Sequence, residues 1–157
     1  MRKKIFIISS IILFIDIISK RLVIGSLLVS ESISIIDNFF RITYALNTGV
    51  AFSMIEGYVG FIIIMTVIVI MMIFKYVKNN NISKYEEIGY SFILGGAIGN
   101  LLDRVIYGYV IDFLDFNIFG YDFPIFNIAD SFIVIGVLIL GIISFREVGE
   151  KNEVSIR

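Results

Sequence analysis

The 157-residue sequence contains no cysteine, no histidine and only one proline. Without cysteine it has no disulfide, no thiolate metal ligand and no cysteine nucleophile. Without histidine it has no Ser-His-Asp or Cys-His catalytic group and no His-Glu-x-x-His zinc motif. No segment resembles a linker or an internal repeat, so we expect one compact unit. If the chain carries out hydrolysis, its carboxylates are the catalytic groups to consider.

Charged residues are also scarce. They make up 17% of the sequence, whereas hydrophobic residues make up 58% and the mean hydropathy is +0.94. A typical soluble domain carries about 25% charged residues. As a soluble domain this chain would expose too much apolar surface, which indicates an integral membrane protein. The net charge of −1 says little, because it averages over the two sides of a membrane.

Four long apolar runs remain once the charged positions are set aside. A spanning helix needs about 20 mainly apolar residues. The candidate spans lie at about 5–24, 58–77, 88–106 and 128–145, with outer loops at about 25–57 and 107–127. The predicted fold class is therefore an all-α membrane protein with four transmembrane helices, forming a single integral membrane domain over residues 1–157.

The distribution of basic residues predicts the orientation of these spans. With the N-terminus inside, nine of the 13 Lys and Arg residues fall on the inner side: Arg2, Lys3, Lys4, Lys75, Lys78, Lys84, Arg146, Lys151 and Arg157. This excess favours both termini in the cytoplasm. A cleaved signal peptide is the competing interpretation of the first run. We favour a retained helix, because Asp16 and Lys20 interrupt the run and no Ala-x-Ala cleavage site follows.

The two outer loops contain strand and turn signals. Residues 41–46 are rich in β-branched and aromatic side chains, and residues 47–49 form a turn sequence. Residues 117–122 predict a hairpin around Gly120. The second loop is also unusually aromatic, which is typical of the membrane–water boundary. An ordinary aromatic belt explains these rings equally well, but it does not explain the carboxylates among them.

Asp112 and Asp130 both lie in apolar sequence on the predicted outer side. A charged group at membrane depth costs roughly 2.5–3.5 kcal/mol on insertion scales, which makes both residues functional candidates. Asn127 and Asp130 also match a helix cap, so capping is an alternative role for Asp130. If the two carboxylates are close, one has a raised pKa and acts as the acid. The helix dipole favours an ionised Asp130, and the apolar neighbours of Asp112 favour its protonated form.

Other polar residues occur at spacings that allow them to cooperate. Asp16 and Lys20 are four apart on one helix face, which suits either a mutual salt bridge or an orienting role in a site. In residues 47–53, Asn47 and Gly49 form either a plain turn or a contact to a bound peptide backbone.

The third apolar run combines small and polar residues. Its glycines at 95, 96 and 99 predict close helix packing. Asn100, Asp103 and Arg104 follow and can share one side of the helix. They suit either an anchor at the membrane interface or a site in which Arg104 holds a lipid phosphate or a substrate carbonyl.

In chain order these segments resemble one family. Asp16-x-x-x-Lys20 and residues 47–53, 95–104, 110–113 and 126–130 together resemble the lipoprotein signal peptidase, or signal peptidase II, family. The resemblance implies an intramembrane aspartic peptidase of the bacterial cytoplasmic membrane. Such enzymes remove the signal peptide from diacylglyceryl-modified prolipoproteins, just before the lipidated cysteine.

The resemblance also implies particular residues and partners. The catalytic pair falls on Asp112 and Asp130. The supporting residues are Asp16, Lys20, Asn47, Gly49, Asn100, Asp103, Arg104 and Asn127. The family's small extracytoplasmic β-rich cradle and its flexible covering segment correspond to parts of residues 37–57. The implied partners are prolipoproteins, membrane lipids and globomycin-type inhibitors, with no metal, cofactor or nucleic acid, and the protein is expected to be a monomer.

Three other classes fit part of the sequence. A small proton-coupled transporter would also use intramembrane carboxylates, but these acids cluster at one edge instead of crossing the bilayer. A non-enzymatic scaffold would use the glycine-rich run but leaves Asp112 and Asp130 unexplained. A Ser-Lys hydrolase needs no histidine, yet Lys20, the only lysine near the outer face, has Asp16 beside it to keep it charged.

Overall fold

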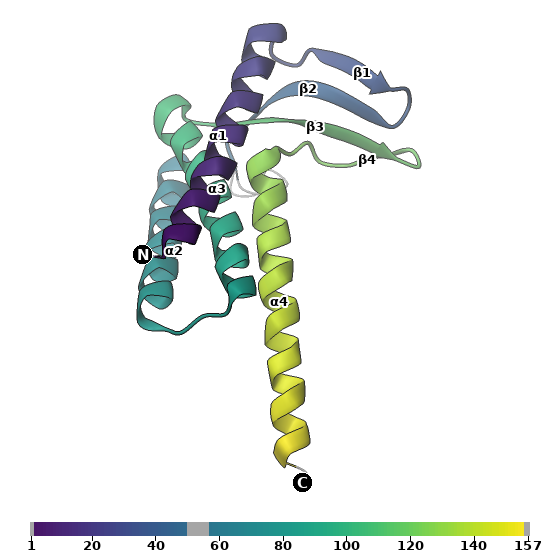
Figure 1. Ribbon diagram of the computed structural model, residues 1–157. Coiled ribbons are helices and arrows are strands. Elements are labelled where there is room, and N and C mark those ends of the chain that lie inside the picture. The colour runs from purple at the N-terminus through teal and green to yellow at the C-terminus, as the bar shows by residue number, and fades with distance from the viewer. Residues whose placement is uncertain (1, 50–56, 156–157) are drawn as a thin grey trace.

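The computed structural model describes residues 2–49 and 57–155, with side chains described as far as residue 146. The protein is mostly helical with a small antiparallel sheet (Figure 1). The helices are α1 (Lys3–Ser26), α2 (Val59–Asn79), α3 (Lys84–Tyr107) and α4 (Ile128–Ser155), and the strands are β1 (Ser32–Ile36), β2 (Phe40–Asn47), β3 (Val110–Ile118) and β4 (Tyr121–Asp122). The four helices coincide with the four apolar runs, although α4 continues beyond its predicted end near residue 145.

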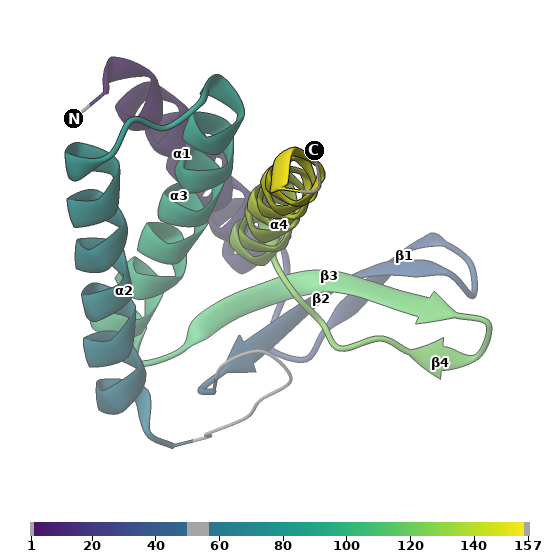
Figure 2. The same ribbon diagram turned by 90° about the horizontal axis from the view of Figure 1, so that it is seen from below.

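All four strands come from the two predicted outer loops. They pair in the order β1-β2-β3-β4 and extend sideways from one end of the helix bundle (Figures 1 and 2). The predicted strand at 41–46 lies in β2, and the predicted hairpin at Gly120 joins β3 to β4, with Gly120 at φ +87°. β1 was not predicted separately, and its residues are all exposed, with no core-facing pattern.

The register of β2 and β3 places the first catalytic candidate. Phe40 pairs with Phe116 and Ala45 with Asp112, with a bulge in β2 between residues 42 and 45. Side chains alternate between the two faces of a strand, so Asp112 points away from the face that carries its neighbours Ile111 and Phe113.

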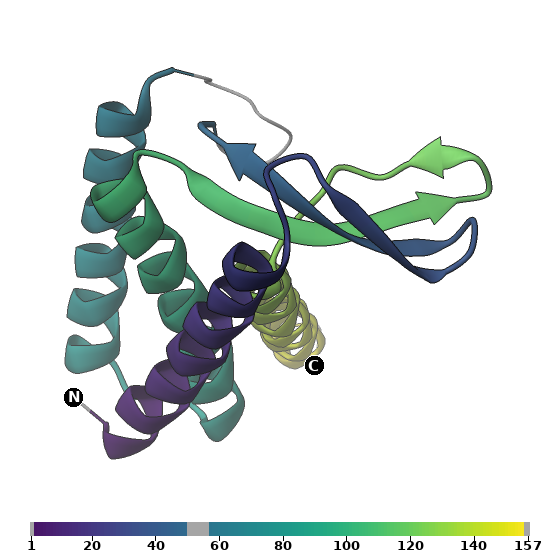
Figure 3. The same ribbon diagram turned by 90° about the horizontal axis from the view of Figure 1, so that it is seen from above.

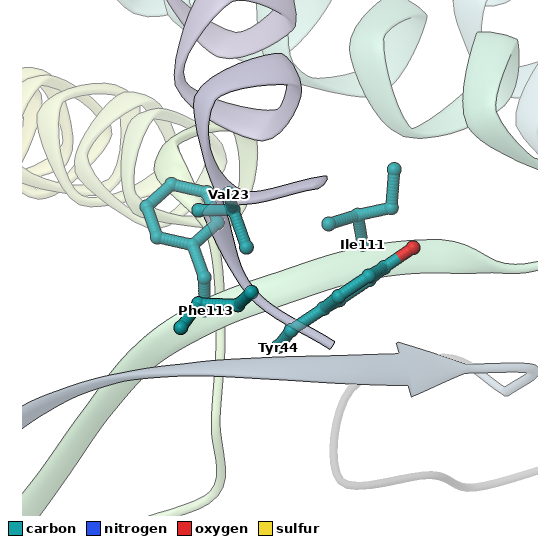
Figure 4. Close-up of a cluster of buried hydrophobic side chains, with 5 residues drawn as sticks. Val23, Tyr44, Ile111 and Phe113 are labelled. Carbon is teal, nitrogen blue, oxygen red and sulfur yellow. The ribbon is translucent and has the colours of Figure 1, made fainter. Parts of the chain in front are cut away.

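A buried apolar cluster fixes that strand against α1. Val23 and Leu27 at the end of α1 pack on Tyr44 of β2 and on Ile111 and Phe113 of β3 (Figure 4). Figure 3 shows the end of α1 lying beside the sheet at this point. Because this cluster occupies one face of β3, Asp112 is held in place on the other.

The helices pack closely through glycine, as predicted for the third run. A Cβ atom at Gly95 would lie 2.9 Å from the Ile12 side chain of α1, and one at Gly99 would lie 2.5 Å from Oδ2 of Asp16. A Cβ atom at Gly96 would press on the carbonyl oxygen of Ala129 in α4. These contacts bring α1, α3 and α4 together at the level of Asp130.

A second glycine contact was not predicted. A Cβ atom at Gly136 of α4 would lie 2.7 Å from the carbonyl oxygen of Gly89 in α3, and one at Gly89 would lie 2.8 Å from Leu140. The two glycines are 47 positions apart, so no local spacing in the sequence links them.

Among the described residues, two helices are long and apolar enough to cross a membrane, namely α2 and residues 128–146 of α4. Only 6% and 11% of their most apolar segments are buried within the protein, so their apolar side chains face outward. α1 and α3 are of similar length, and each carries charged residues that are buried in the bundle. The start of α1 and the end of α4 lie away from the sheet (Figure 1).

Candidate active site

Asp112 lies on β3 and is only 2% exposed. Its two carboxylate oxygens accept hydrogen bonds from two side-chain amides. Nδ2 of Asn47, at the end of β2, is 2.8 Å from Oδ2, and Nδ2 of Asn127, just before α4, is 2.7 Å from Oδ1. A buried carboxylate thus meets amide donors from two separate elements.

Asp130 occupies the first turn of α4, where it takes part in the predicted helix cap. Its backbone N–H donates to Oδ1 of Asn127 at 2.8 Å, and the Asn127 backbone N–H donates to Oδ2 of Asp130 at 3.2 Å. Oδ1 of Asp130 accepts a separate hydrogen bond of 2.7 Å from Nδ2 of Asn100. The cap uses one carboxylate oxygen and the site the other, so the two roles proposed from sequence are compatible.

Asn127 connects the two carboxylates. Its Nδ2 donates to Asp112 and lies 3.1 Å from Oδ1 of Asn100, while its Oδ1 caps the helix at Asp130. Burial of Asp112, together with the nearby charge of Asp130, raises the pKa of Asp112 to about 7. The donors Asn47 and Asn127 oppose this rise without cancelling it. The raised pKa agrees with the sequence prediction, whereas the catalytic role of Asp112 stays a prediction.

Lys20 lies next to Asn100 and is 2% exposed. Its Nζ is 2.8 Å from Oδ2 of Asp16, 2.8 Å from Oδ2 of Asp103 and 3.1 Å from Oδ1 of Asn100. The predicted Asp16–Lys20 salt bridge is therefore confirmed, but it is one part of a larger buried network. Asp16 also accepts the Ala129 backbone N–H at 3.0 Å, which ties α1 to the start of α4.

Asp103 and Arg104 point to different partners. Oδ2 of Asp103 accepts the Ile111 backbone N–H at 3.2 Å, which anchors the start of β3. Nη2 of Arg104 donates to the Gly49 carbonyl oxygen at 2.5 Å, and the Gly49 N–H donates to Oδ1 of Asn47 at 2.9 Å. The predicted turn at 47–49 is thus present. Residues 50–53 of that motif, and the rest of the proposed covering segment as far as residue 56, lie outside the described residues.

All ten predicted site residues contribute to one connected set of contacts. They are Asp16, Lys20, Asn47, Gly49, Asn100, Asp103, Arg104, Asp112, Asn127 and Asp130. They come from α1, β2, α3, β3 and α4, except for Gly49, which follows β2, and Asn127, which precedes α4. The arrangement offers two carboxylates, surrounded by amide and cationic donors, for acid–base chemistry on a polar bond.

One charged cluster was missed by the sequence reasoning. Asp115 of β3, 4% exposed, accepts hydrogen bonds from Arg41 Nε at 2.9 Å, Arg41 Nη2 at 3.0 Å and Thr43 Oγ1 at 2.6 Å. Burial alone would raise the pKa of Asp115, but the bonds from Arg41 and Thr43 lower it below its usual value. This cluster joins β2 to β3 on the face opposite Asp112. Only the strand register could have revealed it.

Fold and site together define a membrane protein with a buried carboxylate pair at one end of a helix bundle. A family model described as signal peptidase (SPase) II matches residues 8–146. The chain belongs to the signal peptidase II family and is a protease. This result supports the peptidase interpretation and not the transporter alternative.

Similar proteins extend over the whole chain. The lipoprotein signal peptidase of Staphylococcus haemolyticus (strain JCSC1435) is 38% identical over 97% of this chain and 100% of its own length. That of Staphylococcus aureus (strain MRSA252) is 35% identical over the full length of both. A solved bacterial membrane enzyme at 2.3 Å resolution is 33% identical with a TM-score of 0.89, covering 96% of this chain and 93% of that one. A second, at 1.9 Å resolution, is 34% identical with a TM-score of 0.81, covering 90% and 92%.

Proposed function

We propose that this protein is an aspartic endopeptidase that removes signal peptides from diacylglyceryl-modified prolipoproteins, cutting on the N-terminal side of the lipidated cysteine. The observation that carries this proposal is the pair Asp112 and Asp130, two carboxylates joined through Asn127. The substrate class is inferred from the similar enzymes, which are named lipoprotein signal peptidases.

In the proposed reaction the two carboxylates divide the proton transfers. Asp130, at the positive end of the α4 dipole, takes a proton from water, which attacks the scissile carbonyl. Asp112, whose pKa is raised, holds a proton that supports the developing oxyanion and then passes to the leaving amine. Asn47, Asn100 and Asn127 keep both carboxylates oriented through this exchange.

The proposed position in the membrane rests on where apolar residues, charged residues and the sheet lie in the structure. We place four transmembrane helices with both termini in the cytoplasm and the sheet on the outer surface of the bacterial cytoplasmic membrane. Three observations support this: the exposed apolar faces of α2 and α4, the burial of the charged residues of α1 at the site, and the location of the sheet away from the start of α1 and the end of α4. In this arrangement Asp112 and Asp130 lie near the outer face, and acyl chains of the substrate lie between helices.

The substrate class can be tested with two matched peptides. Purified enzyme in detergent is given a prolipoprotein peptide with an S-diacylglyceryl cysteine and the same peptide with an unmodified cysteine. We expect cleavage of the lipidated peptide and at least about 100-fold slower cleavage of the other, because remote binding energy aligns the scissile bond. Equal cleavage of both peptides would reject the lipoprotein specificity but would still show that the protein is a peptidase.

The pH dependence of kcat should be bell-shaped. Because the pKa of Asp112 is about 7, its proton is lost above that pH, both carboxylates become ionised and the acid is missing. At low pH the second carboxylate is protonated and the base is missing. We therefore expect an alkaline limb near pH 7 and an acidic limb at lower pH, measured on the lipidated peptide. A profile without the acidic limb would count against a carboxylate pair.

Asp16→Asn should separate a supporting role from a catalytic one. Within the described part of the chain, Asp16 forms an ion pair with Lys20 and accepts the Ala129 backbone N–H, and neither contact is with Asp112 or Asp130. Asparagine keeps an oxygen for the Ala129 N–H but loses the ion pair. A small displacement of the site costs up to about 100-fold in rate, so we expect a measurable kcat that is lowered by less than this factor. A loss as complete as that of Asp112→Asn would place Asp16 among the catalytic residues.

A further inference from the structure

Three side-chain amides surround the two carboxylates: those of Asn47, Asn100 and Asn127. Each amide has a donor end and an acceptor end, and only the donor end suits a carboxylate oxygen. A reversed amide would aim its carbonyl oxygen at the carboxylate, so that a hydrogen bond is replaced by repulsion. The site therefore needs something that fixes the direction of each amide.

For Asn47 and Asn127, a backbone N–H fixes the direction of the amide. The Gly49 N–H donates to Oδ1 of Asn47, so Nδ2 of Asn47 faces Asp112. The Asp130 N–H donates to Oδ1 of Asn127, so Nδ2 of Asn127 also faces Asp112. A backbone N–H can only donate, and the direction of both amides follows from it.

Asn100 has a different arrangement. Within the described part of the chain, its Oδ1 accepts from two side chains, Lys20 Nζ at 3.1 Å and Asn127 Nδ2 at 3.1 Å, and its Nδ2 donates to Asp130 at 2.7 Å. Of its two donors, Asn127 Nδ2 owes its direction to the Asp130 backbone N–H and also donates to Asp112. The ammonium group of Lys20 can only donate.

The ammonium group of Lys20 is held by two ion pairs, at 2.8 Å to Asp16 Oδ2 and at 2.8 Å to Asp103 Oδ2, and it donates a hydrogen bond to Asn100 Oδ1. The carboxylates come from α1 and α3, so the ammonium group is held between two helices. The two site carboxylates, Asp112 and Asp130, are close enough to interact electrostatically with it.

We propose that Lys20 is a positioning residue that, together with Asn127, sets the direction of the Asn100 amide, so that Asn100 presents an N–H to Asp130. This inference rests on the proposed function, because it takes Asp130 as a reacting group. It assigns Lys20 a role beyond balancing the charges of Asp16 and Asp103. Lys20 acts through Asn100 and need not touch the substrate.

The test is a double-mutant cycle on the lipidated peptide with Lys20→Met, Asn100→Ala and the double variant. Loss of one preorganised donor typically costs about 100-fold, so we expect each single variant to lower kcat by about 10–100-fold with KM within about twofold. Because Lys20 acts through Asn100, adding Lys20→Met to Asn100→Ala should lower kcat by less than about threefold more. A multiplicative loss in the double variant would overturn the proposal.

A charge-balanced variant separates positioning from folding. Lys20→Met leaves Asp16 and Asp103 without their cation, which destabilises a buried site. Lys20→Met combined with Asp103→Asn removes one charge of each sign, and we expect its thermal unfolding temperature to rise back toward that of wild type while kcat stays low. Recovery of kcat to within about threefold of Asp103→Asn alone would show that Lys20 only balances charge, and would contradict the proposal.

The activity of the wild-type enzyme distinguishes a failure of this inference from a failure of the proposed function. If wild type cleaves no lipidated peptide, the proposed function fails. If wild type cleaves and the Lys20 variants retain wild-type kcat, only the role of Lys20 fails.

Discussion

Asp112→Asn and Asp130→Asn will each lower kcat on a lipidated prolipoprotein peptide by at least about 1,000-fold, without loss of the folded state. Asparagine keeps the size and one oxygen of aspartate, so the hydrogen bonds from Asn127 and Asn100 can be retained in part. It cannot take or release a proton in this pH range. The loss should therefore appear in kcat, with little change in KM or in the thermal unfolding temperature.

Asp115→Asn provides the matched control. Asp115 is on the same strand as Asp112 and is almost as buried, but it lies on the opposite face and is held by Arg41 and Thr43. The same chemical change there should reduce stability and leave kcat within about threefold of wild type. The contrary result would be that folded Asp115→Asn loses as much kcat as Asp112→Asn. In that case, the removal of any buried charge from this strand lowers kcat, and no proton-transfer role of Asp112 is needed to explain its loss.

Gly96→Ala will destabilise the protein by about 2–3 kcal/mol, the upper range for overpacking of a tight contact. The added methyl group would press on the carbonyl oxygen of Ala129, and backbone cannot rotate away as a side chain can. Because Ala129 precedes Asp130, the movement that relieves this contact also displaces the carboxylate. We expect a lower thermal unfolding temperature and a reduced kcat in the fraction that remains folded.

Gly141→Ala is the control for that substitution. Gly141 is also a helical glycine, in α4, but a Cβ atom there would meet nothing within 4 Å. Alanine favours helix over glycine by about 1 kcal/mol, so Gly141→Ala should be neutral or slightly stabilising. If both variants are equally stable, the close packing of α3 on α4 does not position Asp130.

Much of this fold could be predicted because the relevant signals are local. The four helices correspond to apolar runs, and the hairpin at Gly120 and the turn at 47–49 have their own turn residues. The cap formed by Asn127 and Asp130 is likewise a pattern within four residues. Such features need no knowledge of which elements meet in space.

The remaining features depend on contacts between distant segments. The pairing of Arg41 with Asp115 requires the β2–β3 register, and the contact of Gly89 with Gly136 requires the α3–α4 packing. The sequence could place Lys20 near Asp16, four residues away, but not near Asn100 on another helix. From sequence, capping and catalysis are alternatives for Asp130, because sequence does not reveal that its two oxygens have different partners.

The most direct test of the carboxylate pair is to identify the products formed from a lipidated prolipoprotein peptide by mass spectrometry. Wild type and Asp112→Asn are incubated under identical conditions in detergent. We predict that wild type releases the intact signal peptide and a product that begins with the S-diacylglyceryl cysteine, and that Asp112→Asn releases neither above background. The same two products from Asp112→Asn at near wild-type rate would contradict the account.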